Sequence, residues 1–275
     1  MKVLTSGCFL AMALCFPVFA MADDSPETTS DSSVVADDSA DGSANESADG
    51  SPDATEILKG VDRALSIAED FRATIELVTT TASGRTEERT MTVAQKGQHQ
   101  RLVQLTGPAR LRGVGLLAKD EGQLYIYLPS FGRIRRVAGQ QRGEPFLGSN
   151  FTQDDLSRTE FSGRFEPELA DEDSEHWTVH LTPNEPDDEP YEHLVIKVRK
   201  EDHQVPEILF FEDGSQEPTR RLTASDFRRE DNQVLAHTVI VEDLQSESRS
   251  VAKLSDVEVN TGLSDSLFTR RYLQR

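Results

Sequence analysis

The chain has 275 residues, of which 49 are acidic and 29 are basic, so it carries a formal net charge of −20 at pH 7. The phosphate backbone repels a chain this acidic, which argues against nonspecific binding to nucleic acid. Both cysteines, Cys8 and Cys15, lie in an apolar N-terminal segment, and the rest of the chain can form neither a disulfide nor a cysteine metal site.

Residues 1–22 are predicted to be a signal peptide rather than part of the fold. Lys2 gives a positive start, residues 3–20 are almost wholly apolar, and Ala20-Met21-Ala22 has the small residues typical of a signal-peptide cleavage site. Cleavage after Ala22 would leave an exported protein in the periplasm. Two alternatives stay open: lipidation of Cys8, which follows a short Thr-Ser-Gly stretch, and retention of the segment as a membrane anchor.

Residues 23–54 are predicted to form a disordered acidic linker. They contain ten acidic and no basic side chains, and Val34 and Val35 are their only large apolar residues. Such a segment buries too little apolar surface to offset the entropy lost on ordering. The folded domain is therefore expected to comprise residues 55–275, a length that suits one domain with its own core.

The domain is predicted to open with a helix and to continue as a series of strands. Residues 53–56 resemble a capping box, and apolar residues then repeat at helical spacing at Leu58, Val61, Leu65 and Ala68. From Phe71 the apolar period changes to two, which is typical of a half-buried strand. Turn signals divide the rest of the chain into strands at residues 71–77, 86–95, 98–105, 115–119, 124–128, 133–138, 160–166, 176–181, 194–199, 206–211, 222–228, 234–242 and 250–259, with a last helix at 264–273. This spacing predicts a mainly β fold, an antiparallel meander.

Some of these strands are apolar on both faces. Residues 116–117, 124–128 and 208–211 lack the alternation of apolar and polar residues that marks a strand with one face in water. Both faces of these strands must therefore be covered. A sheet curved round an apolar hollow would satisfy this pattern, and so would a sheet between an ordinary core and a covering helix.

The sequence contains no recognisable catalytic motif. His176 and His180 are close in sequence, but on a strand they would stand about 13 Å apart, too far to share a metal ion, and no third ligand lies nearby. Nucleophile motifs and complete phosphate-binding glycine motifs are absent from the sequence. Asp154 and Asp155 are expected to start a short helix, where negative charge suits the helix dipole. We therefore expect no metal, no cofactor and no enzymatic activity, with an envelope hydrolase built on paired carboxylates as the alternative.

A basic stretch interrupts the general acidity of the chain. Residues 101–142 contain eight basic and two acidic side chains. Within this stretch, Arg133 and Arg135 should project from one face of a strand and Arg136 from the other. Arginine binds phosphate and carboxylate groups through two hydrogen bonds at once, so these three residues are a candidate docking surface for an anionic headgroup or an acidic partner. The alternative is a solvated sheet edge that discourages aggregation and pairs with nearby acids.

Two segments resemble the outer-membrane lipoprotein-sorting proteins, the LolA-like family. Leu124-Tyr-Ile-Tyr-Leu-Pro-Ser-Phe-Gly-Arg-Ile-Arg-Arg-Val-Ala138 is similar to that family's Tyr-Leu-Pro and Gly-x-x-Arg-Arg strand pair. Pro145-Phe-Leu-Gly-Ser-Asn-Phe-Thr-Gln-Asp-Asp-Leu156 is similar to its Phe-x-Gly-Ser-Asp-Phe loop, with Asn150 in place of the aspartate. The loop residues that carry the resemblance are Phe146, Gly148, Ser149, Phe151 and Asp155. Weaker matches follow at residues 206–214 and 257–268, while residues 194–199 lack the tryptophan common in the family.

The resemblance implies an unclosed antiparallel β-barrel, in effect a deeply curved sheet, that is lidded by helices and hollow inside. It also implies a periplasmic, non-enzymatic carrier that binds lipid or lipoprotein acyl chains for transport toward the outer membrane, with an inner-membrane exporter as partner. We expect the first helix to form part of the lid and the cavity to be lined by Leu116, Leu124, Ile126, Leu128, Leu209 and Phe211. An envelope-stress sensor with the same fold is the alternative function. The sequence predicts no particular oligomeric state.

Overall fold

The computed structural model describes residues 52–66, 69–97, 99–119, 123–158, 160–231 and 233–275, without the side chains of residues 139 and 140. The predicted signal peptide at residues 1–22 lies outside this range, and so does all of the predicted linker except its last three residues. Both remain predictions.

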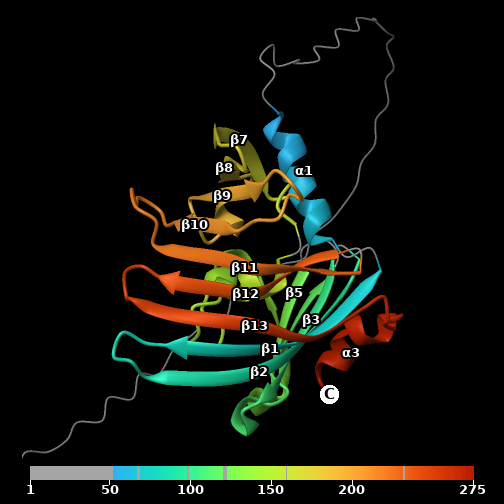
Figure 1. The fold of residues 1–275 in the computed structure, drawn as a ribbon. Coiled ribbons are helices and arrows are strands. Elements are labelled where there is room, and N and C mark those ends of the chain that lie inside the picture. Colours follow the sequence, from blue (N-terminus) through green and yellow to red (C-terminus); the bar gives the residue numbers. More distant parts are fainter. Residues whose placement is uncertain (1–51, 67–68, 98, 120–122, 159, 232) are drawn as a thin grey trace, which may run out of the picture. The chain divides into compact units, whose positions relative to one another are not determined.

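The described chain is built on one antiparallel sheet of thirteen strands (Figure 1). The strands are β1 (Asp70–Thr80), β2 (Thr86–Lys96), β3 (Gln100–Gly107), β4 (Gly115–Lys119), β5 (Gln123–Leu128), β6 (Arg133–Val137), β7 (Phe165–Glu172), β8 (His176–Pro183), β9 (His193–Arg199), β10 (Glu207–Phe211), β11 (Arg220–Glu230), β12 (Gln233–Asp243) and β13 (Ser248–Val259). Their order in the sheet is β6-β5-β4-β3-β2-β1-β13-β12-β11-β10-β9-β8-β7. Among the described residues β6 and β7 are the two edge strands, so the sheet stays open.

Strands β1 and β13 join the two halves of this sheet. They pair antiparallel, with Phe71 opposite Val259 and Ile75 opposite Leu254, whereas every other strand pair in the order connects strands that are consecutive in sequence. The predicted antiparallel meander and the unclosed, curved sheet are thus confirmed.

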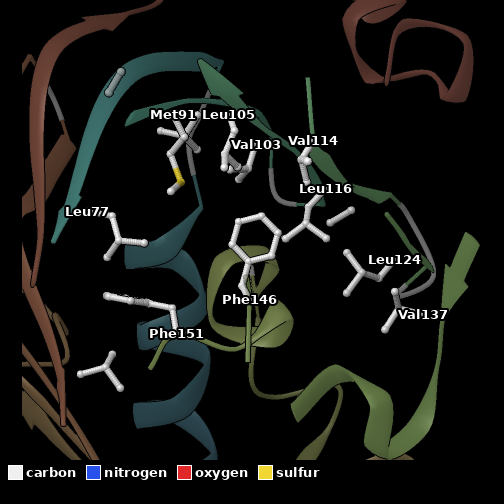
Figure 2. Close-up of a cluster of buried hydrophobic side chains, with 14 of the residues drawn as sticks. Leu77, Met91, Val103, Leu105, Val114, Leu116, Leu124, Val137, Phe146 and Phe151 are labelled. Atoms are coloured by element: carbon white, nitrogen blue, oxygen red, sulfur yellow. The ribbon is translucent and has the colours of Figure 1, made fainter. Parts of the chain in front are cut away.

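Alternate residues of each strand point to opposite faces of the sheet. We call inner the face that carries Leu77, Val103 and Leu116, where a large hydrophobic cluster gathers (Figure 2). The outer face carries Leu117, which packs in a smaller cluster with side chains from the C-terminal end of the chain. Leu116 is 1% exposed and Leu117 is 0% exposed. The prediction that this strand is covered on both sides is therefore confirmed.

Helix α1 (Ala54–Leu65) begins where the capping pattern predicted. The carboxylate of Asp53 accepts a hydrogen bond from the backbone N–H of Thr55 at 2.9 Å, which satisfies one of the unpaired donors of the first turn. The buried face of the helix carries Ile57, Leu58 and Val61, which belong to a second cluster with residues of β7 to β10. This helix therefore covers the part of the sheet that is built from β7 to β10.

The strand predicted at residues 160–166 begins later, as β7 at Phe165. Phe161 and Ser162 donate backbone hydrogen bonds to the buried carboxylate of Asp62 in α1, at 2.6 and 3.0 Å. Because these two N–H groups donate to a side chain of α1, the residues just before Phe165 form a turn that is hydrogen-bonded to the helix, and they do not extend β7. The prediction placed this strand about five residues too early.

The single helix predicted at residues 264–273 is two short helices. These are η5 (Asp265–Phe268) and α3 (Arg270–Leu273), and Thr269 between them has an extended backbone. Phe268 and Leu273 are almost fully buried against the outer face of the sheet. The C-terminal segment thus covers the outer side of the early strands.

Candidate functional site

Residues 145–156, which carry the second family-like motif, fold into the inner face of the sheet. Phe146 and Phe151 are 1% and 4% exposed and insert among the strand side chains (Figure 2). The N–H of Phe146 donates to the carbonyl of Phe151 at 2.7 Å, and Ser149 Oγ donates to the carbonyl of Phe146 at 2.8 Å. Gly148 has a φ of +76°, in the left-handed region that favours glycine. We call residues 145–156 the plug loop.

Helix α2 (Gln153–Ser157) follows and starts with a capping box. Thr152 Oγ1 accepts from the N–H of Asp155 at 3.1 Å, and Asp155 Oδ2 accepts from the N–H of Thr152 at 2.7 Å. Asp155 also forms a buried ion pair with Arg220 of β11. The same arginine donates to the carbonyl of Asn150 at 3.2 Å. The predicted helix start is confirmed. The ion pair of Asp155 with Arg220 also connects the plug loop to the sheet.

Asp154 is the centre of a buried ion cluster. Its carboxylate contacts Arg158 and Arg164, the latter at 2.9 Å, and lies 3.7 Å from Arg142. Arg164 in turn pairs with Glu189 at 2.6 Å. Burial by itself would raise the pKa of Asp154, but the charges of Arg158 and Arg164 outweigh it and hold this pKa well below its usual range. Arg142 belongs to the basic stretch for which pairing with nearby acids such as Asp154 was one of the two interpretations. Sequence reasoning missed Arg158 and Arg164, because nothing in the sequence marks which base will meet which acid.

Further polar contacts hold the turn of the plug loop. Arg89 of β2 is buried and its Nη2 donates to the carbonyl of Leu147 at 2.6 Å. Asn150 Nδ2 donates to Ser248 Oγ at 2.6 Å, and Asn150 Oδ1 accepts from Ser250 Oγ at 2.8 Å. An asparagine can donate and accept at once, whereas an aspartate can only accept when ionised. The departure from the family pattern at position 150 thus suits the pair of serines on β13.

A pocket of about 280 Å³ lies between the plug loop, the end of α1 and the inner face of the sheet. Most of its wall is apolar, as is usual for sites that bind organic ligands. The apolar wall includes Leu65 of α1, Phe151 and Leu156 of the plug loop, Phe161, Ile208, and the strand residues Phe71, Ile75, Val93, Val103, Leu222, Val239, Ala252 and Leu254. The polar residues that line it are Gln95, Arg101, Asp155, Arg158, Gln204, His237 and Lys253.

The residues predicted to line a cavity lie elsewhere: they are Leu116, Leu124, Ile126, Leu128, Leu209 and Phe211, and none of the six lines this pocket. The first four face inward and belong to the cluster that contains Phe146, in which Leu116 and Leu124 are buried and Ile126 and Leu128 are partly buried. The last two point to the outer face, because the alternation of β10 sends Ile208 and Phe210 inward. Apolar residues on both faces correctly indicated cover on both sides of β4, whereas on β10 only the inner residues Ile208 and Phe210 are buried. The pattern did not indicate which strands border a hollow. The end of α1 does line the pocket, at Ala64 and Leu65.

The three predicted docking arginines lie on β6 and are exposed. The register of β6 against β5 places Arg133 and Arg135 on the inner side and Arg136 on the outer side. In the part of the chain that the structure describes, none of the three is in an ion pair. The two acids of α2 pair with other arginines. Phe131, in the turn before β6, is 70% exposed, so this hairpin presents an apolar ring beside unpaired positive charge.

Solved structures share this architecture at low sequence identity. The chain is similar to an outer membrane lipoprotein-sorting protein domain from Vibrio parahaemolyticus, with 22% identity, a TM-score of 0.71 and coverage of 81% of this chain and 98% of that one. A DUF1329 family protein from Desulfovibrio piger gives 18% identity and a TM-score of 0.72, covering 80% and 97%. A LolA superfamily protein from Nitrosomonas europaea gives 23% identity and a TM-score of 0.67, covering 81% and 100%. The fold is that of the LolA-like, outer-membrane lipoprotein-sorting proteins.

A family model described as an uncharacterized protein family matches residues 97–275, and the chain belongs to that family. No curated protein matches the chain. Within the described ranges, no helix is long and apolar enough to cross a membrane. The same residues contain no group of three or more His, Cys, Asp or Glu side chains placed to hold a metal ion.

Proposed function

We propose that the protein is a non-enzymatic carrier that holds the acyl chain of a lipid or lipoprotein in the inner-face pocket. The observation that carries this proposal is the pocket itself, which has about 280 Å³ of space, a mainly apolar wall and a place beside the packed core. This volume is just below the roughly 300–1,000 Å³ usual for ligand sites. Each CH2 group moved from water into such a pocket contributes about 0.8 kcal/mol, so an acyl chain can bind without special chemistry.

We place this carrier in the periplasm, on a route toward the outer membrane. The predicted signal peptide at residues 1–22 supports export. The likeness in fold to a lipoprotein-sorting domain supports the transport role. We further propose that Arg133, Arg135 and Arg136 form the docking surface for anionic headgroups or for an inner-membrane exporter. Their exposure and lack of ion-pair partners among the described residues support this assignment.

The bound molecule can be sought directly. Native mass spectrometry of the protein purified gently from its own envelope should show an added mass, and extraction followed by lipid analysis should assign it to a lipid or an acylated peptide. Consistent recovery of the bare protein from envelopes, together with failure to take up fatty acid in solution, would contradict the proposal.

A pocket-filling variant locates the binding site. Ala252 of β13 lines the pocket, so Ala252→Phe places a ring where the acyl chain is proposed to lie. We expect its affinity for a fluorescent fatty acid to fall at least tenfold. Ala170→Phe is the matched control, because Ala170 is exposed on edge strand β7, and it should bind like the wild type. Equal binding by both variants would place the ligand outside this pocket.

A further inference from the structure

Two basic residues of the pocket wall, Arg101 and Lys253, have no acid within ion-pair distance among the described residues; Lys253 is exposed, whereas Arg101 is partly buried. Arg101 of β3 shares the inner face with Val103 and Leu105, and it is partly buried where it lines the pocket. Its Nε and Nη2 both donate to the side-chain oxygen of Gln95, at 3.0 and 2.5 Å. That oxygen belongs to a neutral amide, so the hydrogen bonds orient the guanidinium group without neutralising its charge.

The other arginine that lines the pocket, Arg158, is paired with an acid, and the acid that lines it, Asp155, is paired with an arginine. Arg158 contacts Asp154, and Arg220 contacts Asp155. Within the described ranges no carboxylate lies within ion-pair distance of Arg101. Glu160, the acid that reaches toward this end of β3, lies 3.6 Å from the Nδ1 of His99. The positive charge of Arg101 at the pocket is therefore uncompensated by the described protein groups.

Desolvation makes this arrangement unfavourable for the protein alone. Burial lowers the pKa of Arg101 to about 10, yet the group stays cationic at neutral pH. A partly buried, unpaired charge costs stability unless an opposite charge meets it. An anion bound next to Arg101 would therefore stabilise its charged guanidinium group.

Arg158 supplies a second unused donor at the same pocket. Its Nε and Nη2 are hydrogen-bonded to Asp154, but its Nη1 is buried and has no hydrogen-bond partner among the described residues. Arg158 lines the pocket together with Arg101. Two guanidinium groups therefore border one apolar space.

We propose that this end of the pocket binds the anionic group, a carboxylate or a phosphate, of an amphiphile whose acyl chain lies along the apolar wall. Arg101 is the principal contact, since its planar guanidinium can donate two parallel hydrogen bonds to either group. The inference rests on the proposed carrier function and adds the chemical class of the ligand. A neutral lipid or a long-chain alcohol would leave the charge of Arg101 unpaired.

A merely structural role for Arg101 is the competing explanation. Gln95, which Arg101 contacts, donates to the carbonyl of Leu65 at the end of α1 at 3.2 Å. Arg101 could thus serve only to orient Gln95 and, through it, the helix. That role would make the arginine important for stability but indifferent to the charge of a ligand, so ligand charge is the readout that separates the two explanations.

The test compares ligands of one chain length with different headgroups. Dodecanoate, dodecyl phosphate and dodecanol would each compete with a fluorescent probe for the full-length mature protein, at constant salt and below the micellar concentration. We expect at least one of the two anions to bind at least tenfold more tightly than the alcohol, a difference of about 1.4 kcal/mol. The ratio between dodecanoate and dodecyl phosphate tells which anionic group is preferred. In Arg101→Gln the preference over the alcohol should fall below threefold, while the affinity for dodecanol stays within about threefold of the wild type.

The matched control is Arg112→Gln, an exposed arginine of the same basic stretch that neither lines the pocket nor belongs to the proposed docking surface, and it should keep the wild-type preference. Equal binding of both anions and the alcohol by the wild type would overturn the inference while leaving the carrier function intact, and this comparison needs no variant to fold. Binding of none of the three ligands by the wild type would overturn the carrier proposal and the inference with it. An anion preference that persists in a folded Arg101→Gln variant would also overturn the role assigned to Arg101.

Discussion

Phe146 is the residue whose removal most directly tests how the plug loop packs. Its ring is 1% exposed and lies in the inner-face cluster with Val103, Leu116 and Leu124 (Figure 2). Phe146→Ala removes the ring and leaves a cavity that the surrounding strands can only partly close. Replacing a buried phenylalanine by alanine costs about 3–5 kcal/mol. The total stability of a domain is about 5–15 kcal/mol, so this single change should remove a large share of it.

Chemical denaturation followed by circular dichroism measures this loss of unfolding free energy directly, and thermal denaturation measures it as a lower melting temperature. For a domain of this size each kcal/mol lowers the melting temperature by about 2–4 °C, so we expect a drop of roughly 6–20 °C. Phe131→Ala is the control, because that ring is 70% exposed and surface changes usually stay within about 0.5 kcal/mol. A loss of less than about 1 kcal/mol in Phe146→Ala would show that the loop does not pack in the inner face in solution. The pocket would then lack one of its walls.

Three further predictions address the ion cluster, the docking surface and the N-terminal segment. Because its arginine partners hold the pKa of Asp154 below the ordinary value of 3.8, its stabilisation is complete above that value and is lost as the pH falls below it. Asp154→Asn should therefore be less stable than the wild type at neutral pH and show a weaker loss of melting temperature between about pH 5 and pH 2; parallel curves would contradict this. Charge reversal of Arg133 and Arg135 should leave the melting temperature nearly unchanged but weaken binding to vesicles of anionic lipid, and wild-type binding should fall with salt; undiminished vesicle binding by the variant would argue against the docking surface. Deletion of residues 23–51, which keeps Asp53 as the N-cap of α1, should shift the melting temperature by no more than a few degrees, and a large drop would show that the deleted segment contacts the domain.

The sequence predicted most of the sheet because its signals are local. The change of period at Phe71 marks the first strand, and the apolar pair at Leu116 and Leu117 requires cover on both faces. The late start of β7 was not predictable in the same way. It depends on Asp62, which lies about 100 residues earlier and takes the backbone donors of Phe161 and Ser162. Contacts across such separations leave no periodic trace in either segment.

The pocket wall was harder to predict for a related reason. Residues on the inner face of neighbouring strands have the same apolar character whether a side chain or a ligand covers them. Leu124 and Val93 both belong to the inner-face cluster with Phe146, but of the two only Val93 also borders the pocket proposed for the acyl chain. Where the plug loop comes to rest depends on Arg89 and on ion pairs such as Asp155 with Arg220. These side-chain pairings could not be predicted from the sequence alone.

The plug loop, which carries one of the two family-like motifs, contributes both to the packed core and to the pocket wall. Phe146 fills one part of the inner face, while Phe151, Asp155 and Leu156 from the same loop form part of the pocket wall. The ion pair of Asp155 with Arg220 holds that wall against β11. The loop therefore limits the hollow under the curved sheet to the space beside it, near β1 to β3 and β10 to β13. A ligand that extended farther toward β4 and β5 would have to displace Phe146 and break contacts of the buried loop. This packing favours a carrier for an acyl chain that enters beside the loop over one whose whole inner face is open to cargo.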